Sequence, residues 1–168
     1  RSANALALME TAIMKNTLDG VRRGLDNGIS PDDLLPHYPS TALGMAAQEG
    51  NFDIVRLLLD RGANVNQTFG QHNATALSQA CQTARSAVVR LLIESRADIH
   101  FSGHSCLENI IETSGEMNEH LIPARSMQEI NDERTAIAKL LLGPQLRISL
   151  GTSTRASLES QLSLDGDF

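Results

Sequence analysis

Apolar and polar residues follow a helical pattern over residues 41–66. A run of small and apolar side chains is followed by a second apolar run at i, i+1, i+3 and i+4 spacing: Ile54, Val55, Leu57 and Leu58. This pattern predicts two short helices, 42–49 and 52–61, each of which buries one stripe. Thr41 is placed to cap the first helix, and Gly62 is placed for a left-handed turn after the second.

The same pattern returns further along the chain at one constant offset. Residues 41–47 align with 75–81, and residues 54–59 align with 88–93. We call this offset, from Thr41 to Thr75, the repeat period. A fixed period of this size indicates stacked helix pairs that bury a continuous core between them. Such stacks bind other proteins more often than they catalyse reactions.

The helix pair at 41–66 and the loop after it carry a family resemblance. These residues read Thr-Ala-Leu-Gly-x-Ala-Ala-x-x-Gly-Asn-x-x-Ile-Val-Arg-Leu-Leu-Leu-x-x-Gly-Ala-Asn-Val-Asn and resemble the ankyrin repeat. The unit at 75–100 is similar, with Ala84, Arg96 and His100 where the preceding unit has Gly50, Gly62 and Asn66. The resemblance implies an all-α repeat solenoid, in which each helix pair is followed by a short hairpin loop. A left-handed Arg96 costs more free energy than glycine, so a looser helix end is expected there.

Weaker units flank the two regular ones. In the first unit, residues 22–25 are Arg-Arg-Gly-Leu where the regular outer helix has Arg-Leu-Leu-Leu. This is typical of a terminal repeat that faces water, or of an internal repeat with a polar contact if Arg1 begins only a fragment. In the last unit, an insertion at 114–132 separates the two helices, and Pro123 prevents one continuous helix. The chain is therefore predicted to hold about four units in one domain, 1–143, followed by an extended or flexible tail at 144–168; the units are 7–40, 41–74, 75–104 and 105–143.

The net charge of −6 lies in one segment. Between Ser105 and Glu133, seven acidic residues are opposed by one arginine, so the remainder of the chain is neutral. The absence of a basic stripe disfavours nucleic-acid binding. No apolar run approaches the roughly 20 residues of a membrane span. The insertion 114–132 is either a solvated loop or a contact for a basic partner.

Two cysteines bear on the cellular compartment. Cys81 and Cys106 have no CxxC spacing and are predicted to be reduced thiols, with Cys81 buried. Reduced thiols favour a cytoplasmic protein, with the nucleus or a host-cell cytoplasm as alternatives.

Residue types that could support catalysis or metal binding do not form a recognisable site. His100, His104 and Cys106 are metal ligands by type, but a fourth ligand is not nearby. Residues 103–107 begin like a nucleophile elbow but lack its closing glycine. An active site in the insertion would have only His120, Arg125 and the acids. We therefore expect no enzyme, no cofactor and no metal.

The resemblance also implies where a partner would bind. Ankyrin repeats bind through their hairpin tips and the exposed side of their first helices. On the matching units these candidate partner-binding residues are Met45, Gln48, Glu49, Phe69, Gln71, His72, Asn73, Gln79, Gln82 and Thr83. Phe69 either contacts the partner or folds back onto the repeat. Because the set is mostly uncharged, it predicts a hydrogen-bonding surface with one or two apolar anchors and modest salt dependence.

The sequence therefore predicts a non-enzymatic protein-interaction module, of the scaffold or adaptor kind. The alternative is an adaptor or host-directed effector fragment whose activity lies in another domain.

Overall fold

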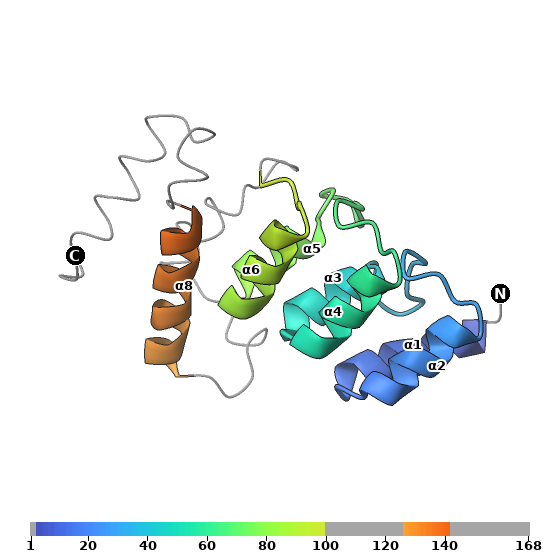
Figure 1. Cartoon of the computed structure of the whole chain (residues 1–168). Helices are drawn as coiled ribbons and strands as arrows, with labels where there is room; N and C mark the ends of the chain where they lie inside the picture. The colour runs from blue at the N-terminus through green and yellow to red at the C-terminus, as the bar shows by residue number, and fades with distance from the viewer. Residues whose placement is uncertain (1–2, 100–125, 142–168) are drawn as a thin grey trace.

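The computed structural model of the chain describes residues 3–99 and 126–141. Three helix pairs follow one another, and a longer helix packs on the third pair (Figure 1). The helices are α1 (Ala3–Met14), α2 (Leu18–Asp26), α3 (Ala42–Glu49), α4 (Phe52–Asp60), α5 (Ala76–Gln82), α6 (Ser86–Glu94) and α8 (Met127–Leu141). Strands are absent from these two described ranges. The loops contain isolated antiparallel bridges, between Leu34 and Thr41 and between Phe69 and Ala74.

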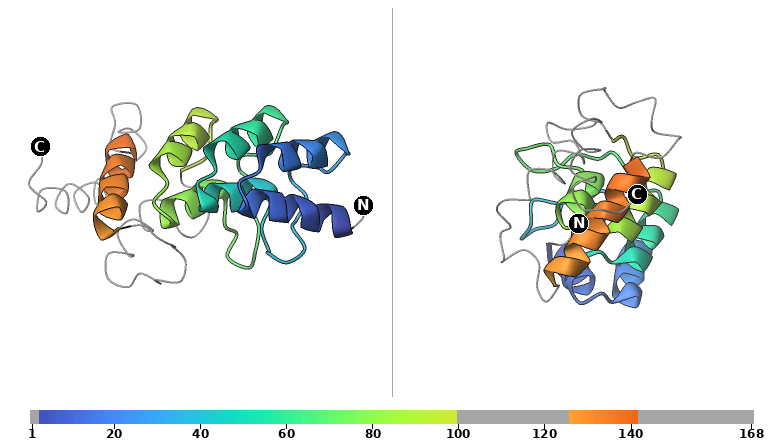
Figure 2. Two further views of the ribbon diagram at one scale, coloured as in Figure 1. Left: turned by 90° about the horizontal axis from the view of Figure 1, so that it is seen from below. Right: turned by 90° about the vertical axis from the view of Figure 1, so that its left-hand side faces the viewer.

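The helix pairs stack in two rows (Figure 2). α1, α3 and α5 form the inner row, and α2, α4 and α6 form the outer row. Small side chains allow the inner helices to approach closely, since Ala46, Ala47 and Ala80 are completely buried. The predicted all-α repeat solenoid is therefore confirmed.

Local sequence signals set the helix bounds. Thr41 and Thr75 cap α3 and α5 by accepting a hydrogen bond from the backbone N–H three positions ahead. Gly62 takes the predicted left-handed backbone, with φ of 84°. Arg96 and Ala84 also take positive φ, 66° and 50°, at positions where the preceding unit has glycine. The third unit therefore holds the left-handed strain that its sequence indicated.

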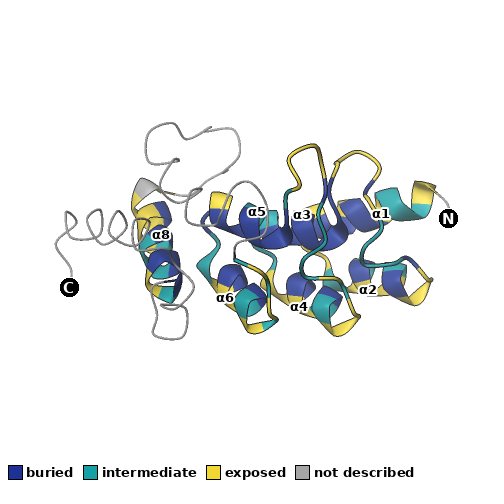
Figure 3. Cartoon of the chain, turned by 90° about the horizontal axis from the view of Figure 1, so that it is seen from above, coloured by how far each residue is buried: buried dark blue, intermediate teal, exposed yellow. Residues whose placement is uncertain are grey.

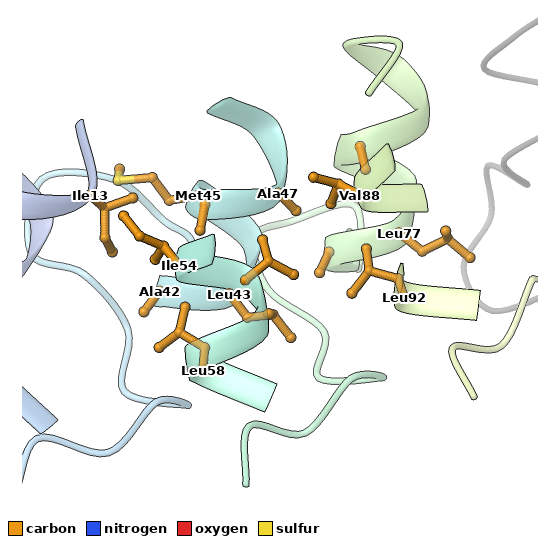
Figure 4. Packing of buried hydrophobic residues seen from close by; sticks show 14 of the residues in the cluster. Ile13, Ala42, Leu43, Met45, Ala47, Ile54, Leu58, Leu77, Val88 and Leu92 are labelled. Atoms are coloured by element: carbon orange, nitrogen blue, oxygen red, sulfur yellow. The ribbon is translucent and has the colours of Figure 1, made fainter. Parts of the chain in front are cut away.

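The core lies between successive units. Figure 4 shows Ile54 of α4 beside Ile13 of α1, and Val88 of α6 beside Ala47 of α3. All four side chains are buried. Complete burial of one such aliphatic side chain stabilises the fold by about 1.5–3 kcal/mol. These positions therefore hold each unit to the one before it.

A polar ladder joins the loops outside this core. Asp32 Oδ1 accepts a hydrogen bond from the Asn64 amide at 2.9 Å, and Asn66 Oδ1 accepts one from the Asp98 amide at 2.8 Å. The two acceptors are one repeat period apart, and so are the two donors. The repeat period therefore governs the loop contacts as well as the apolar packing.

Part of the predicted insertion is helical. The sequence places it over 114–132, but residues 127–132 are the first part of α8. The cause is a capping box, in which Ser126 and Glu129 each accept a hydrogen bond from the other's backbone amide. The remainder of the insertion and the predicted tail at 144–168 lie outside the described residues.

α8 covers the far side of the third unit. Ile137 and Leu141 are fully buried in the common core. Glu133 Oε2 accepts a hydrogen bond from the Ser86 amide at 2.8 Å, where α6 begins and its helix dipole favours negative charge. Desolvation by burial lowers the pKa of the Arg134 guanidinium on the same helix.

The cysteine prediction is wrong at one position. Cys81 on α5 is buried as expected, but it is disulfide-bonded and not a reduced thiol. The chain's second cysteine, Cys106, lies outside the described residues. Because disulfides persist mainly in oxidising compartments, the cysteines no longer point to the cytoplasm.

Candidate protein-interaction surface

Two loop tips project from the side of the inner helices (Figure 3). The first tip is residues 36–39, and the second is residues 70–73, one repeat period later. Every residue of both tips is exposed. We call these two tips, together with the side of α1, α3 and α5 that carries Met14, Gln48 and Gln82, the inner surface.

The second tip decides between the two roles expected for Phe69, a partner contact or a ring folded back onto the repeat, in favour of the second. Its ring is only 7% exposed and packs over Gly44 of α3. A Cβ atom at Gly44 would lie 2.5 Å from Phe69 Cε1, so only glycine leaves room for the ring. The backbone N–H and C=O of Phe69 pair with those of Ala74 at 2.9 Å. Phe69 therefore holds the tip in place, and Gln71, His72 and Asn73 are left to face solvent.

The first tip is built on a different contact. Leu35, which corresponds to Phe69 in the period, is buried. Glu10 of α1 is 5% exposed, and its Oε2 accepts a hydrogen bond from the His37 amide at 3.3 Å and lies 3.1 Å from His37 Nδ1. A buried carboxylate thus holds this tip, and Tyr38 remains 44% exposed at its end.

Sequence reasoning missed the first tip. Tyr38 and Leu34 are among the large exposed apolar residues, at 44% and 57%. The signal was present, because Tyr38 lies one repeat period before His72, which was a predicted contact. The sequence of the first unit is similar to the other units only as far as the glycine turn at Gly28, and the loop after it is not similar.

The inner helices contribute one row of side chains across three units. Met14, Gln48 and Gln82 share one position of the period, and Met14 is 61% exposed. Gln82 is exposed and Gln48 is half-buried. The row therefore places an apolar side chain and two amides in line beside the tips.

Comparison with known families decides the classification. Residues 8–102 match the family model for ankyrin repeats, in three copies. The chain belongs to the ankyrin repeat family. Ankyrin repeats are generally protein–protein interaction modules and are typically non-enzymatic. No curated protein matches the chain. The predicted fourth unit, 105–143, lies beyond the matched residues.

Three of the predicted contact residues are buried in this ankyrin stack. Phe69 is the first. Met45 is only 3% exposed, because it packs in the core. Thr83 is also 3% exposed, and its Oγ1 lies 3.0 Å from the carbonyl oxygens of both Gln48 and Gln79, one of which accepts its proton. These residues support the surface from beneath. The predicted residues with accessible side chains are Gln48, Glu49, Gln71, His72, Asn73, Gln79 and Gln82.

Charge on the inner surface is balanced. Lys15, directly after α1, and Glu49 of α3 share one position of the period, and both are exposed. The tips contain no Asp, Glu, Lys or Arg. The ankyrin surface therefore presents hydrogen-bonding and apolar groups in greater number than formal charges.

Residues 3–99 and 126–141 contain no group of three potential metal-ligating side chains. The same residues hold no helix with the length and apolar character needed to cross a bilayer. His100, His104, Cys106 and His120, considered above as ligands or catalytic groups, lie outside them.

Proposed function

We propose that this ankyrin repeat chain is a non-enzymatic module that binds a partner protein through the inner surface. The observation that carries the proposal is the exposed first tip, with Tyr38 at its end, beside a polar second tip at the same position of the period. An exposed aromatic side chain on an anchored loop is the kind of residue that dominates binding energy at interfaces.

Two apolar anchors are available on this surface. Tyr38 on the first tip and Met14 on α1 take the role that the sequence assigned to Phe69 and Met45. Gln48 and Gln82 continue the row from Met14 and can hydrogen-bond to a partner's backbone. Because formal charges are few and balanced, we expect binding to change little between low and high salt.

The proposal is tested by capture of the partner with two aromatic variants. Tyr38→Ala removes the exposed ring on the inner surface. Phe52→Ala is the matched control, because Phe52 is 38% exposed on the outer helix α4. We expect Tyr38→Ala to weaken binding by about tenfold or more and Phe52→Ala to leave it unchanged.

Cross-linking mass spectrometry on the captured complex gives a second readout. Cross-links from Glu49 and from the His72 tip would support the proposal. Cross-links confined to 114–132 would contradict it and would move binding to the acidic insertion, for which a basic partner remains the prediction. A loss of binding above physiological salt would also contradict the proposal, because it would indicate binding through charged residues.

A further inference from the structure

The first helix pair carries a groove that borders the inner surface at α1 and Lys15. It lies across α1 and α2, has a volume of about 480 Å³, and is open to solvent. Its floor includes Ala12, Gly20 and Gly24, and Leu8 stands at its edge with 67% of its surface exposed. We call it the end groove.

The repeat period explains why this face is hollow. Gly20 and Gly24 correspond to Ile54 and Leu58 of α4, which are fully buried. Figure 4 shows Ile54 reaching the preceding unit, where it lies beside Ile13. At the first unit no side chain projects from these positions. A Cβ at Gly20 would lie 2.7 Å from Ala12 Cβ, so α2 lies close against α1 here. This face therefore lacks the aliphatic side chains that the other units supply, and an occupant must bring its own.

Charges around the end groove have one sign. Lys15 and Arg23 line it, and both are exposed. The lining residues include no Asp or Glu. The groove therefore combines an apolar floor with a positively charged rim.

The geometry points to a docking site for an acidic amphipathic helix of another protein. Large aliphatic side chains at i, i+4 and i+7 would occupy the space above Gly20 and Gly24 and contact Leu8. Acidic residues beside that stripe would meet Lys15 and Arg23. Helices commonly bind grooves in this way, with an apolar face inserted and charges at the margins.

A pair of synthetic helical peptides tests the site on the whole chain. Both peptides have leucines at i, i+4 and i+7; one has glutamates beside them and the other has lysines. Fluorescence anisotropy should show that the glutamate peptide binds and that the lysine peptide binds at least about tenfold more weakly. Equal binding of the two peptides would overturn the proposal.

Matched variants locate the binding. Leu8→Ser should lower the affinity for the glutamate peptide by about tenfold. Leu34→Ser, at a similarly exposed leucine on the first loop, should leave that affinity unchanged. Arg23→Glu should lower the affinity for the glutamate peptide by about threefold. Arg22→Glu, on the same helix but outside the groove lining, should leave it unchanged. All four residues are exposed, so circular dichroism should show unchanged folding.

Two further results separate this site from its rivals. Tyr38→Ala should leave peptide binding unchanged, and Leu8→Ser should leave partner capture by the inner surface unchanged. If Tyr38→Ala abolished peptide binding, the peptide would bind the inner surface and not the end groove, and the proposal would be wrong. If sedimentation showed a dimer that Leu8→Ser dissociates, the groove would be a contact between copies of the chain and the proposal would be wrong.

Discussion

The first and second units have the same order of helices and loops, but they pack different side chains at equivalent positions. The second unit fills its side toward the preceding unit with Ile54, whereas the first has Gly20 at that position. The second unit seats its tip by an aromatic ring on Gly44, whereas the first uses the buried carboxylate of Glu10. Gly44 and Glu10 are equivalent positions of the repeat period.

This comparison shows that the repeat period sets the path of the backbone. Single positions within each unit determine which side chains are exposed on the inner surface. Helices and turns recur because caps and apolar stripes recur. Tip chemistry differs because the residue beneath each tip differs. As a result, the first tip exposes an aromatic residue and the second exposes amides and a histidine.

The largest expected effect comes from the core position that the two units do not share. Leu58→Ala should lower the free energy of unfolding by about 2–5 kcal/mol, because the cavity lies between units. Gly24→Ala, at the equivalent position, should raise it by up to about 1 kcal/mol, because alanine favours helix and its methyl would make ordinary contacts at 3.4 Å. Urea unfolding followed by circular dichroism measures both. Equal destabilisation by the two variants would refute the equivalence.

A smaller effect is expected beneath the second tip. Gly44→Ala should destabilise the chain by about 1–3 kcal/mol, because its methyl would overlap the Phe69 ring. In a Phe69→Ala background the same change should lose more than half of its effect, since the ring is gone. Urea unfolding of the four proteins of this cycle provides the test. Additive effects would show that Phe69 does not press on Gly44.

Beneath the first tip, Glu10→Ala should destabilise the chain by about 1–2 kcal/mol, because the His37 amide loses its charged acceptor. Exchange of that amide with deuterium should become faster. His37→Ala is the control, since it removes the ring contact and keeps the amide bond, and it should have the smaller effect. A larger effect of His37→Ala would mean that the ring holds the tip.

The smallest effect is expected for the ion pair that bridges the two units. Arg61 Nη1 lies 2.7 Å from Asp26 Oδ1, with both side chains partly exposed. Arg61→Ala should change stability by less than about 1 kcal/mol, because solvent screens such pairs. The difference from the unsubstituted chain should shrink further at high salt. A loss above about 2 kcal/mol would show that this contact has a larger role than an exposed pair normally has.

Most of the fold could be predicted from sequence because its signals are local. Thr41, Gly62 and the apolar stripe of α4 lie within one unit, and the structure places each where the pattern did. The start of α8 is also signalled locally, by the capping residues Ser126 and Glu129. This signal was not recognised, because the negative charge of the segment is typical of a solvated loop.

The interaction surface was harder to predict because exposure depends on contacts between distant residues. Phe69 is buried only because Gly44, on a helix much earlier in the chain, has no side chain. Tyr38 is exposed because Leu35, and not the tyrosine, turns inward. Carrying the period from His72 back to Tyr38 would have identified the first tip, whereas no local pattern would have shown which way each ring points.

Hydrogen–deuterium exchange of the chain, free and bound to its captured partner, tests the central claim most directly. The inner-surface account predicts slower exchange in peptides that span both tips, 34–40 and 68–74, and in the exposed turns of α1 and α3. Exchange in α4 and α6 should stay unchanged. Protection confined to the outer helices, or to residues 114–132, would contradict the account.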